Sequence, residues 1–180
     1  MKLLPYGCHK IWNRPRQSPT RARQLYRIVL ATQRDRNNKF IPAPSCFSLS
    51  ENDKDDGYGL SVDWDNKTIP EESISRIGLS YKTNSEEYKP YRNREIYAIN
   101  VIFLKSINSV INAVYNPIIK NPEKKGAPNN IAHSLIKFKQ EDYDKNEPEI
   151  LLKIREHAKG NKIAVDMAEV EKIVEEHRIL

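Results

Sequence analysis

The stretch Ile96–Leu104 is the most apolar segment of this 180-residue chain, and it limits most strongly how the chain can fold. It is too short to cross a membrane as a helix, and both of its alternating faces are apolar apart from Asn100. A strand that is apolar on both faces belongs inside a sheet that is covered on both sides. We therefore expect Ile96–Leu104 to be the central strand, with the other elements packed onto it.

Alternation of apolar and polar residues indicates further strands. The clearest is 58–64, where large apolar residues alternate with glycine, serine and aspartate, and this pattern predicts one buried and one exposed face. Between 53 and 57 an acidic, glycine-ended segment predicts a hairpin turn. The remaining predicted strands are 24–31, 45–50, 110–116 and 132–138.

Capping residues mark three helices. Thr68-Ile-Pro-Glu71 is a capping box with proline in the first turn, and it predicts a short helix over 69–81. Asn146–Glu149 and Asp166–Glu169 have the same pattern and predict two C-terminal helices. The sequence thus predicts the α+β class, with a mostly antiparallel sheet of five or six strands, one inserted short helix and two C-terminal helices.

The net charge of +6 is concentrated at the start of the chain. Residues 1–36 hold nine Lys and Arg against one acid, whereas the remaining residues hold 21 bases and 23 acids. A localised basic segment attracts polyanions because binding releases their condensed counterions. We therefore expect a basic N-terminal arm at 1–23, a single α+β domain at 24–180, and nucleic acid (RNA or DNA) or a nucleoprotein complex as the partner.

Aromatic residues lie among bases in two segments of the chain. An exposed ring can stack on a nucleobase while a neighbouring cation neutralises a phosphate, and such contacts carry little sequence preference. For Trp12 the alternative is that its ring pins the arm to its own domain. The candidate nucleic-acid-binding residues are Lys10, Trp12, Arg14, Arg16, Arg21, Arg23, Tyr88, Lys89, Tyr91 and Arg92.

A small intracellular enzyme is the alternative function. Arg27 is a charge on a strand that is apolar on both sides, so it needs a carboxylate, a phosphate or several carbonyls to offset its desolvation. Its order with Ser48 and Glu95 resembles the layout of ADP-ribosyltransferase-like toxins. That resemblance implies that Arg27 holds a pyrophosphate, Ser48 orients a ribose and Glu95 stabilises an oxocarbenium charge. His133, which follows a long Pro/Asn loop, is a candidate general acid or base.

Two other functions are considered, a nuclease and a protein-interaction module. The tripeptides 87–89 and 123–125 match the Glu-x-Lys half of a metal-dependent nuclease core. The two C-terminal helices could instead dock on another chain, whereas the role of an accessory subunit of a nucleoprotein assembly belongs to the nucleic-acid hypothesis. No glycine-rich phosphate loop and no His or Cys pattern with ligand spacing occurs, so we expect no cofactor and no metal. Cysteine usage and the lack of a long apolar stretch predict a cytoplasmic protein without a membrane span.

Overall fold

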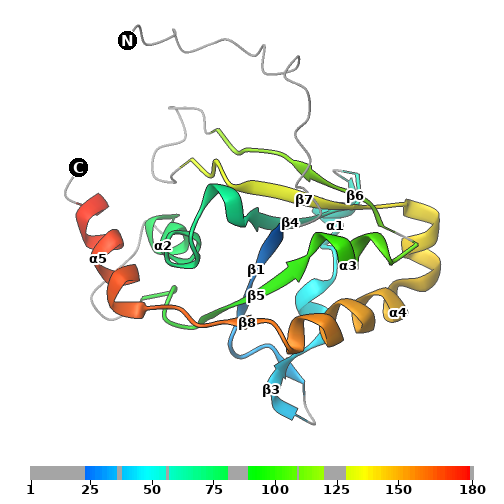
Figure 1. Cartoon of the computed structure of the whole chain (residues 1–180), viewed down its shortest axis with the longest axis horizontal. Helices are drawn as coiled ribbons and strands as arrows, with labels where there is room; N and C mark the ends of the chain where they lie inside the picture. The colour runs from blue at the N-terminus through cyan, green and yellow to red at the C-terminus, as the bar shows by residue number, and fades with distance from the viewer. Residues whose placement is uncertain are drawn as a thin grey trace, which may run out of the picture.

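Figure 1 shows a computed structural model of the chain, which describes residues 23–35, 38–55, 57–80, 89–108, 110–119 and 129–178. These residues form a six-stranded sheet in the order β6-β7-β4-β1-β5-β8, in which every pairing is antiparallel. Its strands are β1 (Gln24–Leu30), β4 (Gly59–Trp64), β5 (Arg94–Asn100), β6 (Val110–Tyr115), β7 (His133–Phe138) and β8 (Lys162–Ile163). A separate pair joins β2 (Arg34–Asp35) to β3 (Asn38–Pro42).

The helices of the described residues complete the predicted α+β fold. They are α1 (Glu51–Asp55), α2 (Pro70–Ser80), α3 (Val101–Lys105), α4 (Gln140–Lys159) and α5 (Met167–Arg178), with 3-10 turns at Pro44–Phe47 and Asp65–Lys67. The fold class is confirmed, because a mostly antiparallel sheet carries the inserted helix α2 and the C-terminal helices α4 and α5.

Helices cover both faces of the sheet. Because side chains alternate along a strand, Leu25, Leu60 and Ile136 share one face, and this face packs against α4 and the first 3-10 turn in the main core. On the other face, Tyr26 and Ile28 of β1 belong to a second core with α2 and α5. Figure 1 shows α2 and α5 together at the left and α4 at the right.

The sheet is divided between its two central strands. β1 pairs with β5 along its whole length, but it pairs with β4 only through Leu25–Trp64 and Tyr26–Asp63. β4 continues its own ladder with β7 as far as Gly59. Two half-sheets, β6-β7-β4 and β1-β5-β8, therefore join at one end, while at the other end β1 and β4 share no ladder.

The predicted central strand is shorter and lies nearer the edge than expected. It ends at Asn100, because the Asn100 side chain accepts a hydrogen bond from the Ile102 N–H at 2.7 Å and so caps α3. β5 also lies beside the two-residue edge strand β8, whereas β4 and β1 occupy the centre. The apolar run thus serves a strand and a helix in succession.

The prediction of a strand at 45–50 and a hairpin turn at 53–57 is wrong. A 3-10 turn occupies Pro44–Phe47, and helix α1 follows. Ser50 and Asp53 form a reciprocal cap, since Asp53 Oδ2 accepts from the Ser50 N–H at 2.9 Å and Ser50 Oγ accepts from the Asp53 N–H at 3.2 Å. Gly57, with a φ of 89°, then turns the chain into β4.

Helix α4 begins earlier than its predicted cap. Asn146 has non-helical angles (φ −124°, ψ 17°), and its side-chain amide donates to the Asp142 carbonyl at 3.0 Å. Pro148 lacks an N–H and disturbs the preceding turn, so the predicted start is a kink inside a longer helix. Asp166 does cap α5, because its Oδ1 accepts from the Ala168 N–H at 2.9 Å.

Close approach of α2 and α5 depends on a glycine. Tyr91 and Val174 are almost wholly buried in the second core. A Cβ atom added at Gly78 would lie 2.7 Å from Tyr91 Cδ1, closer than real Cβ contacts, and 3.0 Å from Val174 Cγ2, which is tighter than most of them. The missing side chain of Gly78 therefore makes room for the Tyr91 ring.

Replacing Gly78 with alanine is expected to destabilise the domain. Overpacking a core costs about 1–3 kcal/mol, and the gain in helix propensity of about 1 kcal/mol offsets only part of that cost. Urea unfolding should show a lower midpoint for Gly78→Ala. Gly160→Ala is the control, because nothing lies within 4 Å of its added Cβ and its φ of −84° suits alanine. Equal midpoints for the two variants would contradict this account.

His157 links α4 to the end of β5. Its ring stacks on Phe103 with centroids 3.9 Å apart, and its Nε2 accepts a hydrogen bond from the Asn100 N–H at 3.2 Å. Burial lowers the pKa of His157 below its usual value. The hydrogen bond from the Asn100 N–H requires the neutral form of the ring, with no hydrogen on Nε2.

The lowered pKa of His157 predicts a loss of stability in mild acid. Below about pH 6.5, the ordinary histidine pKa, the unfolded chain binds a proton at this position more readily than the folded chain does. The free energy of unfolding should therefore fall as the pH drops from 6.5 through the folded pKa, and then level off for this group. Urea unfolding from pH 7.5 to pH 5 should show a weaker decline for His157→Gln than for the unchanged protein. Parallel declines would show that His157 contributes nothing.

Candidate functional site

The junction of the two half-sheets contains a cavity of about 280 Å³. Its walls come from β1, β4, α2 and the start of β7, together with Ile118 and Asn130, which form an isolated bridge. The volume is close to the lower end of the range for small-molecule pockets, about 300–1,000 Å³. The polar residues that matter for its chemistry are Arg27, Ser61, Asp63, Arg76, Asn130 and His133.

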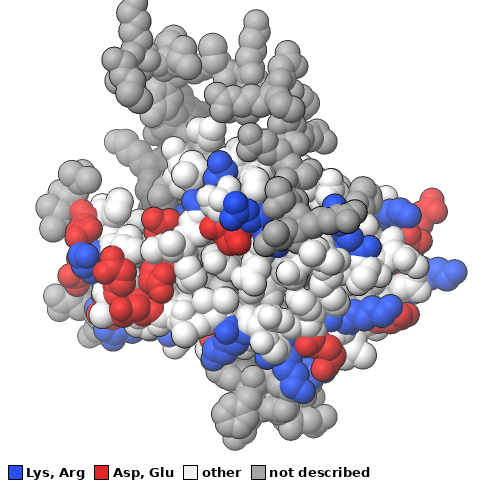
Figure 2. Space-filling model, in the orientation of Figure 1, with Lys and Arg blue, Asp and Glu red and all other residues white. Residues whose placement is uncertain are grey.

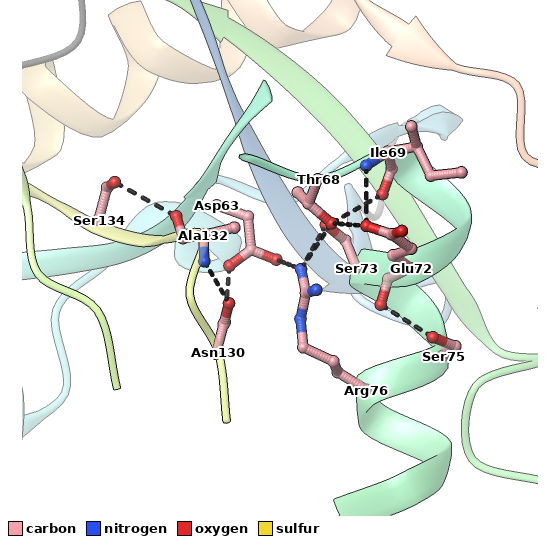
Figure 3. Close-up of polar contacts among 10 residues, drawn as sticks. All are labelled: Asp63, Thr68, Ile69, Glu72, Ser73, Ser75, Arg76, Asn130, Ala132 and Ser134. Carbon is pink, nitrogen blue, oxygen red and sulfur yellow. Dashed lines mark hydrogen bonds and ion pairs between the residues drawn. The ribbon is translucent and has the colours of Figure 1, made fainter. Parts of the chain in front are cut away.

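One wall of the cavity is a hydrogen-bonded network centred on Asp63 (Figure 3). Asp63 Oδ2 lies 2.8 Å from Nη2 of Arg76, and Asp63 Oδ1 accepts from the Asn130 side-chain amide at 2.8 Å. Nη2 of Arg76 also contacts the hydroxyls of Thr68 and Ser73 at 3.1 and 2.9 Å. The network ties together β4, α2 and the segment before β7.

The burial of Asp63 differs from the prediction of an exposed face on β4. Asp63 is only 5% exposed because α2 and Asn130 cover it. A carboxylate at such a position keeps its charge only with a cation and hydrogen-bond donors beside it, and Arg76 and Asn130 supply both. The alternation of apolar and polar residues therefore predicted the strand correctly but predicted an exposed environment for Asp63, which is buried.

Arg27 connects the two half-sheets where the ladder between them has stopped. Its Nε donates to the Cys46 carbonyl at 3.0 Å, and its Nη1 donates to the Ser61 carbonyl of β4 at 2.8 Å. Burial lowers the pKa of Arg27, and the negative charge of Asp53 partly opposes this effect. Among the residues that the structure describes, no carboxylate lies within ion-pair distance of Arg27. Carbonyl groups thus offset its desolvation, which is one of the three solutions expected from the sequence.

His133 faces the same cavity and is oriented by a backbone carbonyl. It is 8% exposed, and its Nδ1 lies 2.6 Å from the Asn116 carbonyl oxygen. A carbonyl can only accept, so the hydrogen of the neutral ring is on Nδ1. The Nε2 lone pair then faces the Ser61 hydroxyl at 3.3 Å.

Ser61 is where two of the predicted catalytic candidates meet. Its carbonyl accepts from Arg27, and its hydroxyl faces His133. Ser61, Asp63, Arg76 and Asn130 are not among the site residues predicted from the sequence. The sequence feature that could have indicated Ser61 and Asp63 is that both are polar and lie on the same face of a strand that is otherwise apolar.

The other two catalytic candidates lie outside the cavity. Ser48 is not on a strand, and its hydroxyl donates to the Ser45 carbonyl at 2.8 Å. Glu95 accepts from the Tyr97 hydroxyl at 2.8 Å and from Lys162 Nζ at 2.8 Å. The cavity therefore brings Arg27 together with His133, but not with Ser48 or Glu95, so the toxin-like layout is not assembled around it.

The nucleic-acid candidates inside the described ranges are Arg23, Lys89, Tyr91 and Arg92. The Arg23 carbonyl accepts from the Val101 N–H at 3.2 Å, and Lys89 and Arg92 both form ion pairs with Glu171 on α5. Tyr91 is 2% exposed, which leaves no ring face open to a base and argues against the predicted stacking role. The candidates outside the described residues are Lys10, Trp12, Arg14, Arg16, Arg21 and Tyr88.

The surface of the described domain carries charges of both signs. Figure 2 shows Lys and Arg scattered over the viewed face, with acidic side chains gathered at the left, where α2 and α5 lie. Of the two Glu-x-Lys tripeptides, 123–125 lies wholly outside the described residues. In the other, 87–89, only Lys89 is described. Within the described ranges, no group of three or more His, Cys, Asp or Glu is placed to hold a metal ion.

Fold and cavity together define an α+β domain with a small cleft in a divided antiparallel sheet. Comparison with models of protein families, with curated proteins and with solved structures finds no match to this chain. None of the helices in the part of the chain that the structure describes is long and apolar enough to span a membrane.

Removing the Asp63 carboxylate is expected to destabilise the protein strongly. Asp63→Ala leaves Arg76 charged in a largely buried setting, and breaking a buried pair in this way costs about 3–5 kcal/mol. The added loss from Arg76→Ala in the double variant should be small, because no uncompensated charge remains. Urea unfolding measures all three variants.

The control for Asp63→Ala is an exposed ion pair. Lys153 and Glu149 on α4 are 55% and 65% exposed, and Glu149→Ala should lower the free energy of unfolding far less than Asp63→Ala does. If Asp63→Ala proved no more harmful than Glu149→Ala, the network would not contribute to the stability of the fold.

Proposed function

We propose that the protein is a nucleic-acid-associated binding protein, or an accessory subunit of a nucleoprotein complex, that acts in the cytoplasm. The supporting observation is how charge is divided along the chain. The described residues hold twenty Lys and Arg and twenty Asp and Glu, so the net charge of +6 comes entirely from the other residues. Residues 1–22 alone hold five bases and no acid.

A charge-balanced domain with basic segments suits non-specific phosphate binding. Several bases of the domain are already paired with acids, as in Arg76–Asp63, Arg92–Glu171 and Lys162–Glu95. Bases in the acid-free range 1–22 have no acidic neighbours in sequence, so they retain more attraction for a polyanion. In this proposal the arm contacts phosphates, Trp12 stacks on a base, and the domain is held near the nucleic acid.

The enzymatic alternative keeps one specific supporting observation. Arg27 and His133 line one cavity, and the Ser61 hydroxyl lies beside a histidine whose other nitrogen is oriented by a carbonyl. A hydroxyl, an imidazole base and a group that orients the base are the components of an activated nucleophile. This observation favours a small-molecule reaction in the cleft and gives no support to a nuclease.

The interaction-module alternative loses its main support. The apolar stripe of α5 suggested a docking surface, but Val170 and Val174 are buried against α2 in the second core. The stripe is therefore used inside the domain.

The nucleic-acid proposal is tested by a matched pair of triple variants with the same change in total charge. One variant replaces three arm bases with glutamine, and the other replaces three exposed bases of the domain. The arm bases are Arg14, Arg16 and Arg21, and the domain bases are Lys105, Lys145 and Lys159. Binding to single- and double-stranded RNA and DNA is measured by fluorescence anisotropy over a salt series.

The arm variant should bind more weakly and with less salt dependence. Each lost phosphate contact lowers the slope of log K against log salt by about 0.9 on double-stranded DNA and about 0.7 on single strands. Loss of three contacts thus lowers the slope by roughly 2–3, while the domain variant stays close to the unchanged protein. Equal weakening in both variants would attribute the effect to net charge, and absence of binding by the unchanged protein at low salt would refute the proposal.

A further inference from the structure

The cleft opens beside Ser61 because the ladder between β1 and β4 has stopped there. The last pair of that ladder is Tyr26–Asp63, so a continued register would place Ile28 directly opposite Ser61. Instead, Ile28 and Ser61 both line the cavity. The ladder of β4 with β7 continues past Ser61 and holds its backbone in place. Ser61 is therefore a hydroxyl residue at the edge of open space on a fixed strand.

The Ser61 hydroxyl and His133 have the geometry of a nucleophile and its base. Nδ1 of His133 carries the ring hydrogen, because it lies 2.6 Å from the Asn116 carbonyl oxygen, so Nε2 is an acceptor. Nε2 lies 3.3 Å from Ser61 Oγ, and Oγ has no other hydrogen-bond partner among the described residues. The usual range for such a pair is about 2.6–3.2 Å, and the contact often tightens only when a substrate binds.

Two further polar residues lie beside this pair. Asp63 is directly opposite His133 in the ladder of β4 with β7. The Cβ atoms of such residues are about 4.5–5.5 Å apart, so the Asp63 carboxylate favours the imidazolium that forms when His133 accepts a proton. Asn130 also lines the cavity, and its side-chain amide donates one hydrogen to Asp63 Oδ1. The second amide hydrogen has no partner among the described residues and supplies a donor for an oxyanion.

The rest of the lining favours an uncharged substrate with a small apolar group. The Asp63 carboxylate lies 2.8 Å from Arg76 and compensates its charge. By strand alternation, the Arg27 side chain lies on the other face of β1, where its Nε donates to the Cys46 carbonyl. A volume of about 280 Å³ limits the substrate to a short chain or a single ring. The apolar surface comes from Tyr26, Ile28 and Ile77.

We infer that Ser61 is the nucleophile of a site that hydrolyses small neutral esters. Ser61 Oγ attacks the carbonyl carbon of the ester while its proton passes to His133 Nε2, and the alcohol then leaves with that proton. Water attacks the acyl-serine ester and gives a proton to His133, which returns it to Ser61 Oγ as the carboxylic acid is released. The site uses none of residues 1–22, so this inference and the proposed function stand or fall separately.

The experiment treats the full chain with phenylmethylsulfonyl fluoride, a small neutral reagent that sulfonylates activated serines. The modified residue is located by mass spectrometry of the peptides. Ser106 is the internal control, because it is exposed and its hydroxyl donates to the Phe103 carbonyl at 2.6 Å instead of facing a histidine. Cleavage of p-nitrophenyl acetate is measured in parallel for the unchanged protein, Ser61→Ala and Ser106→Ala.

We expect the sulfonyl group on Ser61 and not on Ser106. Ester cleavage should fall to the background rate in Ser61→Ala and stay unchanged in Ser106→Ala. Absence of Ser61 modification, together with equal cleavage by the unchanged protein and Ser61→Ala, would overturn the inference. The modification of the unchanged protein needs no variant, so the test holds even if a substitution in the cavity prevents folding.

The role of His133 as the base is tested by His133→Gln. Loss of a general base should slow modification of Ser61 by about a hundredfold or more. His177→Gln is the matched control, because Nδ1 of His177 also lies near a backbone carbonyl, that of Ile173 at 2.9 Å, but on the exposed side of α5. A folded His133→Gln protein that reacts as fast as the control would contradict the inference. The arm variant should react normally, which separates this site from nucleic-acid binding.

Discussion

The bond from Arg27 to the Ser61 carbonyl spans the place where the central ladder of the sheet has stopped. β1 and β4 share only two residue pairs, so each half-sheet depends on its own outer strands for most of its backbone hydrogen bonds. A guanidinium has several donors on a long side chain, so it can bond to a carbonyl that a backbone N–H does not reach. The same side chain reaches Cys46 in the first 3-10 turn, and Arg27 thereby connects β1, β4 and the layer that covers the main core.

The two ends of the junction between the half-sheets solve the problem of buried charge in different ways. Where the ladder persists, Asp63 and Arg76 neutralise each other and Asn130 satisfies the second carboxylate oxygen. Where the ladder has stopped, Arg27 bonds to carbonyls, and no carboxylate among the described residues lies within ion-pair distance of it. A fully compensated pair favours a rigid wall, because moving either partner exposes an unpaired charge. Arg27 is instead held by carbonyls from two different layers, so its position depends on both half-sheets.

Local signals in the sequence predicted most of the elements, and their failures have local causes too. Alternation located β1, β4, β6 and β7, and capping residues located α2 and α5. The extended strand at 96–104 was wrong because Asn100 is both the last strand residue and a helix cap. The helix cap formed by Ser50 and Asp53 was wrongly predicted as part of a turn, and the kink at Asn146 was wrongly predicted as a helix start. Ser, Asp and Asn occur at turns, at helix caps and at kinks, so residue type alone does not distinguish these positions.

Site residues could be predicted from the sequence only where a residue was unusual among its sequence neighbours. Arg27 is out of place on an apolar strand, and His133 follows a long loop, so both could be selected from sequence. Asp63 and Asn130 are separated by 67 residues, and they meet only because β7 pairs with β4 in one register. A shift of one residue in that register would turn His133 to the opposite face of the sheet. Composition and spacing carry no information about such a pairing.

Basic residues in this chain act over two different distances. In the proposed nucleic-acid role, the bases of residues 1–22 act across solvent, where physiological salt screens a charge within about 8 Å, so they attract a polyanion only at short range and do not discriminate among phosphates. Arg27 is surrounded by protein, where screening is weak, and it acts within the domain by bonding to the carbonyls of Cys46 and Ser61. In that proposal the excess charge outside the described residues supplies the attraction, whereas the buried arginines Arg27 and Arg76 hold the divided sheet together. A substitution that alters one of these properties need not alter the other.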